Sequence, residues 1–205
     1  MKRLRRLSAL QYFVVKATLF LLCLAPAAMA GIALPQSVNP VEFLTRESGT
    51  NALRFLIITL CITPLRLATG LNWLIKLRRM FGLFTFSYAA VHFSVYLFLD
   101  LQLDFSVLFA DIVKRKYITV GFTAWLILIA LAATSNDWSI RRMGAKLWGK
   151  LHKAVYAAAP LAAVHFLWLK RGKDWSEPLI YLAIIVFLLA LRHRKAQRFL
   201  SRFHG

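Results

Sequence analysis

Three histidines lie inside long apolar stretches of this 205-residue chain. His92 lies within residues 82–99, and His152 and His165 lie within residues 151–169. An ionisable side chain at membrane depth is costly, so its presence indicates a function or a specific partner. Imidazole is a ligand of haem iron, and facing helices of a bundle can supply it. The histidines therefore favour a membrane protein that binds haem.

The composition supports an all-α, polytopic membrane helical bundle. Hydrophobic residues make up 60% of the chain, whereas a soluble domain has about 45–50%. They come in blocks, and no linker or repeat divides residues 1–205, so we expect one domain. The net charge of +19 could suggest nucleic acid, but the basic residues flank apolar blocks, so no nucleic-acid partner is expected. Cys23 and Cys61 are too few for an iron–sulfur cluster.

Six apolar segments are candidates for crossing a bilayer, which takes roughly 17–25 helical residues. The second and sixth are short between their charges, but Arg54 and Arg192 can snorkel and lengthen them. The predicted spans are Ala17–Leu34, Ala52–Ala68, Met80–Leu99, Tyr117–Asn136, Leu151–Leu169 and Pro178–Leu191.

Basic residues divide unevenly between the two ends of these spans. With the N-terminus in the cytoplasm, 19 of the 27 lysines and arginines fall on the cytoplasmic side. The other side holds every acidic residue except Asp137. The positive-inside rule therefore predicts six transmembrane helices with both termini cytoplasmic.

The N-terminal segment allows a second interpretation. A basic start, an apolar run and the small residues Ala28, Met29 and Ala30 are similar to a cleaved signal peptide. The apolar run continues beyond that site, and Lys16 interrupts its beginning. We therefore favour a retained first span, and cleavage stays open.

The predicted topology places His92 and His165 at similar depth. Both lie in the outer halves of helices that run in the same direction, so each could bind one axial face of a single iron. The alternative is a pair of hydrogen-bonded core histidines. Small residues that precede these histidines by three to ten positions would leave room for a flat macrocycle, or would simply pack helices together. They are Gly82, Ala89, Ala158 and Ala162.

His152 raises the question of a second haem at the inner end. It lies 13 residues before His165, about 20 Å along one helix. Pro160 lies between them and could kink that helix, which would change the direction of one histidine side chain relative to the other. A second haem needs another ligand, for which His193 is a candidate. One haem is therefore better supported than two.

A basic cluster at the inner end could bind an anionic group. Arg78 and Arg79 are its central members, with Lys76, Arg141, Arg142 and Lys146 nearby. Guanidinium groups bind haem propionates or an FMN phosphate by charge-assisted hydrogen bonds. The same residues also serve as topology signals or contact lipid headgroups, and this is the simpler explanation for any one of them.

The sequence resembles the MsrQ (YedZ) family, a member of the ferric reductase-like transmembrane group. The matching segments are residues 49–66, 77–96, 114–125 and 146–168, and the resemblance covers about residues 49–192. Its most specific part is Trp148 followed by Leu151 and His152, with His165 after another 13 residues. The tails and the loop 100–116 depart from the family pattern, so partner contacts there are in doubt.

The resemblance implies a haem b subunit in the bacterial inner membrane rather than a catalytic subunit. It implies that His92, His152 and His165 are metal ligands, that FMN is bound in some members, and that electrons come from the quinone pool. It also implies a periplasmic molybdenum-containing partner of the MsrP type, which reduces methionine sulfoxide in oxidised proteins.

Nucleotide-binding motifs are missing from the sequence. It has no G-x-G-x-x-G fingerprint on a strand–helix unit and no P-loop. We therefore expect electrons to enter from quinol or a separate flavoprotein.

Two alternative functions remain open. One is a stand-alone ferric or small-molecule reductase at the outer face. The other is a proton-coupled transporter that uses the histidines as relays, although no repeated halves or intramembrane carboxylates accompany them.

Overall fold

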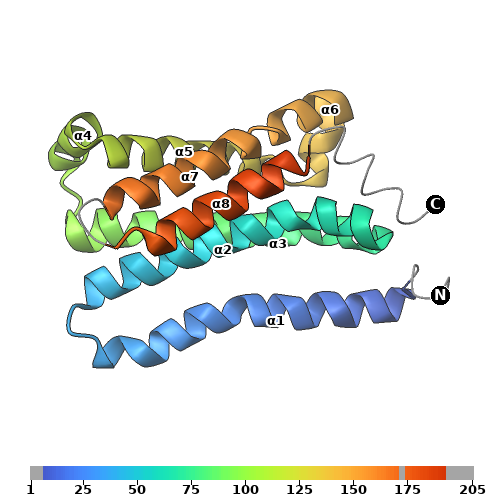
Figure 1. Ribbon diagram of the computed structural model, residues 1–205, viewed down its shortest axis with the longest axis horizontal. Helices are drawn as coiled ribbons and strands as arrows, with labels where there is room; N and C mark the ends of the chain where they lie inside the picture. Colours follow the sequence, from blue (N-terminus) through green and yellow to red (C-terminus); the bar gives the residue numbers. More distant parts are fainter. Residues whose placement is uncertain (1–6, 171–173, 193–205) are drawn as a thin grey trace.

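The computed structural model describes residues 7–170 and 174–192, and every regular element there is helical. Six long helices run antiparallel in one bundle, so that α1 begins and α8 ends at the same end (Figure 1). They are α1 (Ala9–Ala33), α2 (Pro40–Thr69), α3 (Arg78–Ser94), α5 (Lys116–Ala133), α7 (Val155–Leu169) and α8 (Ser176–Ala190). The shorter α4 (Phe105–Lys114) lies at the opposite end, and α6 (Asp137–His152) lies near the end where α1 begins (Figure 1).

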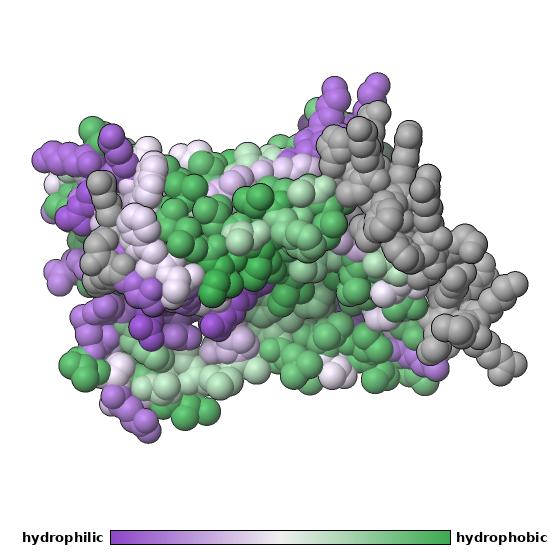
Figure 2. Space-filling model, viewed as in Figure 1, coloured by the Kyte–Doolittle hydropathy of each residue, from purple (hydrophilic) through white to green (hydrophobic). Residues whose placement is uncertain are grey.

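The surface of the bundle is suited to a bilayer. Four helical stretches in the described part are long and apolar enough to cross a membrane: Ala9–Gln36, Pro40–Thr69, Asn72–Asp100 and Lys116–Ala133. The helix Ser176–Ala190 is apolar but shorter. Figure 2 shows an apolar middle, with hydrophilic side chains gathered at the end that holds α4 and over α6 near the opposite end. The predicted all-helical membrane class is confirmed, and six spans with cytoplasmic termini stay a prediction.

Local sequence signals explain where the first helices begin and end. Ser8 and Gln11 form a capping box at the start of α1, which pairs two backbone groups that the helix leaves open. Asn39 caps α2, and Pro40 takes its first position, where the missing N–H costs nothing. Gly70 ends α2 with a φ of 69°, a conformation that glycine adopts without strain.

The second helix is longer than the sequence predicts, because α2 begins at Pro40 rather than at Ala52. Arg54 therefore lies near the middle of a helix instead of at its end. Its guanidinium donates from Nε to the Tyr181 hydroxyl at 3.1 Å and from Nη1 to the Asn51 side chain at 3.2 Å. These bonds to neutral groups satisfy part of a side chain that would be costly in lipid.

Three apolar clusters hold the helices together. One joins α1, α2 and α3 around Phe55 and Tyr88. A second joins α2, α7 and α8 around Leu60 and Ile185. The third is small and joins α3, α5 and α7 through Ala89, Leu128 and Ala158. Ala158, Ala159 and Ala163 are fully buried, and such small side chains let membrane helices approach closely.

A break separates the two histidines that the sequence places on one helix. His152 is the last residue of α6, and α7 begins only at Val155. Within α6, Gly144 has a non-helical conformation with a φ of 77°. Lys153 and Ala154 keep right-handed helical dihedrals and are joined to their neighbours by i to i+3 hydrogen bonds. The predicted span Leu151–Leu169 therefore contains a tight turn near its start and is not one regular α-helix.

Helix α1 is attached to the core through the hydroxyl of Tyr88 on α3. Pro26 lacks an N–H and interrupts the hydrogen bonds of α1 at this point. The Tyr88 hydroxyl accepts from the Ala27 N–H at 3.2 Å and donates to the Cys23 carbonyl at 2.8 Å. A regular helix would pair these two backbone groups with each other. The Tyr88 hydroxyl thus bonds to both of these groups and joins α3 to α1.

Replacing Tyr88 with phenylalanine tests this attachment. The change keeps the ring but removes two hydrogen bonds, so we expect a loss of about 1–2 kcal/mol in the free energy of unfolding. Stability is measured by denaturation in detergent micelles. Tyr12→Phe is the control. Tyr12 also lies on α1 and packs against the same apolar cluster, and the Lys76 Nζ atom lies 5.3 Å from the centroid of its ring. Equal stability of the two variants would contradict the attachment.

Candidate functional site

The structure brings His92 of α3 and His165 of α7 together. Their ring centroids are 6.1 Å apart, and the ring planes meet at 80°. Both lie toward the end of the bundle that holds α4, because their contacts on the neighbouring helices fall near the first residues of α2 and α5. The sequence-based expectation that these two histidines share one depth therefore agrees with their position.

Each histidine ring is held by a backbone carbonyl of a neighbouring helix. His92 Nδ1 lies 2.8 Å from the Thr45 carbonyl oxygen on α2. His165 Nδ1 lies 2.8 Å from the Tyr117 carbonyl oxygen on α5. A carbonyl only accepts, so each Nδ1 must carry the proton and donate it. Each Nε2 then keeps a free lone pair, which is the form that binds a metal.

A glycine makes room for each ring. Gly49 lies four residues after Thr45, and a Cβ there would be 2.8 Å from His92 Nδ1. Gly121 lies four residues after Tyr117, and a Cβ there would be 2.5 Å from His165 Nδ1. Contacts this short do not occur with a real Cβ. The same arrangement, a carbonyl followed after one turn by glycine, therefore supports both histidines.

The separation of the two rings suits a single metal between them. A bond from a metal to an imidazole nitrogen is about 2.0–2.1 Å, and the ring centroid lies about 1 Å behind that nitrogen, so two axial rings have centroids roughly 6 Å apart. The observed 6.1 Å agrees with this. Among residues 7–170 and 174–192, no three His, Cys, Asp or Glu side chains cluster as they would around a bare metal ion. Two histidines alone would leave most positions of an iron unfilled, so an iron held here would need a macrocycle that brings its own donors.

Aromatic and small side chains border the histidine pair. Phe93, next to His92, stacks on Trp125 of α5 with centroids 4.1 Å apart. The Trp125 Nε1 is buried and has no hydrogen-bond partner in the described structure. A buried donor without a partner is costly, so this indole is available to an acceptor on a bound group. Ala89 and Ala158 are buried in one cluster with Leu128, so these two small residues pack helices together, which is the second of the two interpretations that the sequence allowed.

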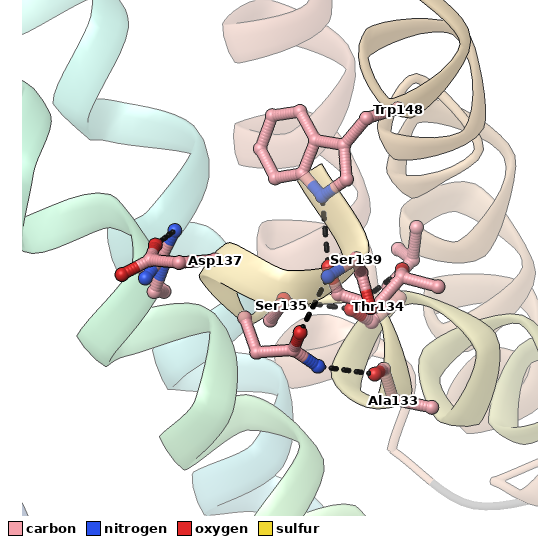
Figure 3. A network of polar contacts seen from close by, with 9 residues as sticks. Ala133, Thr134, Ser135, Asp137, Ser139 and Trp148 are labelled. Atoms are coloured by element: carbon pink, nitrogen blue, oxygen red, sulfur yellow. Dashed lines mark hydrogen bonds and ion pairs between the residues drawn. The ribbon is translucent and has the colours of Figure 1, made fainter. Parts of the chain in front are cut away.

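His152 lies apart from the pair, at the end of α6. Its ring stacks on Trp148, with centroids 3.9 Å apart, and its Nε2 lies 3.1 Å from the Thr134 hydroxyl. The Trp148 indole donates to the Thr134 carbonyl at 2.8 Å (Figure 3). No second histidine accompanies His152 in the part of the chain that the structure describes, and His193 lies outside it.

The two central arginines of the inner cluster have different surroundings. Arg79 forms an ion pair with Asp137 at the start of α6, with Nη2 and Oδ1 2.8 Å apart (Figure 3). Arg78 is partly buried, and it takes part in no ion pair among the residues that the structure describes. Arg78 is therefore better placed than Arg79 to meet an anionic group near His152.

Sequence analysis missed the two supporting glycines and pointed instead to Gly82. Gly82 faces Thr59 of α2, where a Cβ on the glycine would lie 3.9 Å from the threonine methyl group, and so it does not line the histidine pair. The available signal was glycine inside an apolar helix. Such a glycine lowers helix stability by about 1 kcal/mol relative to alanine and often marks a place where another group approaches the backbone closely. The sequence does not show which side chain that group is.

Comparison with known proteins places this arrangement in a family. Residues 48–163 match the model of the ferric reductase like transmembrane component. That range includes both glycines, His92 and His152, whereas α1 precedes it and His165 follows two residues after its end.

Several relatives are similar over most of their length. A protein of Herminiimonas arsenicoxydans is 44% identical over 186 residues, which are 89% of this chain and 85% of the relative. A protein of Bordetella pertussis is 50% identical over 157 residues, which are 76% of each chain. Each is named protein-methionine-sulfoxide reductase heme-binding subunit MsrQ. The chain described here belongs to the MsrQ family of ferric reductase-like transmembrane proteins.

Proposed function

We propose that the chain binds one haem b through His92 and His165 and transfers electrons across the membrane. The observation that carries this proposal is the matched pair of imidazoles, 6.1 Å apart and each fixed at Nδ1 by a carbonyl. The name shared by its relatives, a heme-binding subunit, supports it. Haem supplies a reversible one-electron couple when bound, and the protein supplies ligation and electrostatics.

The side chains define what this site can do. Donation from Nδ1–H to a carbonyl orients each ring and makes Nε2 a stronger ligand. If His92 and His165 both hold the haem, its iron would keep no open position for oxygen or substrate. The site is therefore suited to electron transfer, and this argues against a reductase that binds its substrate on the iron. Trp125 Nε1 is the proposed donor to a peripheral group of the ring.

We further propose that electrons pass from the quinone pool to a periplasmic molybdenum-containing methionine sulfoxide reductase of the MsrP type. Three features support it: the names of the relatives, the charge bias that orients the histidine pair outward, and the absence of nucleotide-binding motifs from the sequence. The proposed setting is the bacterial inner membrane, with six spans and cytoplasmic termini. An FMN near Arg78 belongs to the same proposal.

Replacing either ligand removes the haem if the assignment is right. We expect His92→Ala and His165→Ala each to abolish the low-spin b-type absorbance of the purified chain, because a single histidine cannot hold both faces. His204→Ala, in the C-terminal tail, is the control and keeps the full spectrum. Cells are grown with ample iron and haem precursor. An unchanged spectrum in both variants would exclude this pair as the ligands.

The number of haems separates the outer site from one at His152. We expect a pyridine haemochrome ratio of one haem per chain, unchanged by His152→Ala. A ratio of two that falls to one in His152→Ala would establish a second haem and assign His152 to it. The single-haem proposal would then be wrong, and the outer pair would still stand.

The supporting glycines provide a sharper test of the geometry. In Gly121→Ala the new methyl group meets His165 Nδ1 at 2.5 Å, so the ring must move and its bond to Tyr117 must weaken. Changes behind a metal ligand typically cost 10–100-fold in affinity, and we expect haem retention to fall by about tenfold or more. Gly31→Ala is the control, since nothing lies within 4 Å of that position. Equal haem retention in the two variants is the contrary result.

The electron path is tested with defined partners. The chain is reconstituted in vesicles, its haem is reduced with a quinol analogue, and reoxidation is followed after adding an MsrP-type subunit and methionine sulfoxide. We expect reoxidation only when both are present. Reoxidation by ferric citrate alone would instead favour the stand-alone ferric reductase.

A further inference from the structure

Helix α4 is a short element held rigidly at the end of the bundle. It is seen nearly end-on in Figure 1, across the direction of the long helices. The turn before it contains Gln102 and Leu103 with φ values of 50° and 66°, a conformation that is unfavourable for these residue types. Asp104 then caps the helix by accepting from the Ser106 and Val107 N–H groups. A tight turn and a cap thus fix where α4 starts.

A buried carboxylate clamps α4 to its neighbours. Asp111 is only 7% exposed. It accepts from the Tyr96 hydroxyl at 2.7 Å and pairs with Arg115 Nε at 3.1 Å. Tyr96 lies in the π-helix η4 (Val95–Asp100), one turn after His92. A buried carboxylate requires such partners. Since Tyr96 belongs to a different element, its bond to Asp111 holds this side of α4 toward the core and so fixes the rotation of α4 about its own axis.

That rotation gives α4 three distinct sides. With about 100° per residue, Leu108 and Asp111 share the buried side. Phe105, Phe109 and Val113, spaced by four residues, form one exposed apolar stripe, and they are 55%, 67% and 82% exposed. Ser106 and Lys114 are the exposed polar residues of the helix. Val107, which is 41% exposed, lies beside Lys114, so apolar residues make up most of the exposed surface of α4.

We propose that α4 is an interfacial helix whose apolar stripe lies in the outer leaflet of the bilayer. A helix with an apolar side, a polar side and Lys near its end is typical of the plane between lipid and water. The stripe continues an apolar surface already present on the preceding segment, where Phe98, Leu99 and Leu103 are exposed. Lys114 and Lys116 would meet lipid phosphates at this boundary.

The arrangement of the three sides favours lipid over a protein partner. Large exposed apolar side chains in water usually mark an unsatisfied surface, and here the stripe is continuous with helices that lipid surrounds. A docking surface for a soluble protein would be expected to face away from the bilayer, where α4 presents Ser106 and Lys114 instead. This inference depends on the membrane orientation and not on haem binding.

Spin labels on α4 test the proposal in the full-length chain. Labels are attached at Phe109→Cys and, as the matched control on the polar side, at Lys114→Cys, with Cys23 and Cys61 replaced by alanine. The sample is the labelled chain in nanodiscs of phosphatidylethanolamine and phosphatidylglycerol. At position 109 we expect oxygen, which dissolves in lipid, to relax the spin label several-fold more than a water-soluble nickel chelate does. At position 114 we expect the nickel chelate to relax the label more than oxygen does. Strong relaxation by the nickel chelate at both positions would overturn the proposal and favour a protein-docking surface.

A second measurement avoids the cysteine replacements. Phe109→Trp in the native chain adds one indole to the stripe, and lipids brominated near the headgroup end of the acyl chain should quench its added fluorescence, while aqueous iodide should not. Quenching by iodide alone would contradict the inference. The haem spectrum of each sample is recorded in parallel, so a failure of the haem assignment is recognised separately.

Discussion

Two imidazole rings, each held between a backbone carbonyl and a glycine, set the geometry on which this fold depends. Thr45 and Gly49 of α2 hold His92, and Tyr117 and Gly121 of α5 hold His165. An extra methyl group on either glycine would collide with the ring. The pairs α2–α3 and α5–α7 must therefore approach almost to backbone contact at one depth, and this requirement sets how the other helices pack.

Small residues and long-range hydrogen bonds make this approach possible. Ala158, Ala159 and Ala163 are fully buried along α7, so this helix can approach its neighbours closely. On the opposite side of α2, Arg54 bonds to Tyr181 and links α2 with α8. At the end of the bundle that holds α6, the ion pair between Arg79 and Asp137 joins α3 to α6. The buried interior of the bundle combines small side chains along α7 with large apolar ones such as Phe55 and Leu60.

Much of this arrangement could be predicted from the sequence. Blocks of apolar residues indicate the helices, and their order places His92 and His165 at one depth. Pro160 predicts a distortion between His152 and His165, but it lies inside α7, and the interruption falls six to seven residues earlier, at Lys153 and Ala154. The exact site could not be predicted, because Lys153 and Ala154 are ordinary helix formers. The partners of the two ring Nδ1 atoms are backbone carbonyls, which a sequence pattern does not distinguish from any others.

The attachment of α1 has a consequence for its evolution. Tyr88 binds α1 through the carbonyl of Cys23 and the N–H of Ala27, which are groups that every residue except proline offers. Only Pro26, which interrupts the helix there, and the tyrosine on α3 are chemically specified. This contact therefore leaves the identity of the α1 side chains open, and the limits on them come from the apolar cluster that Cys23, Tyr12 and Leu19 join.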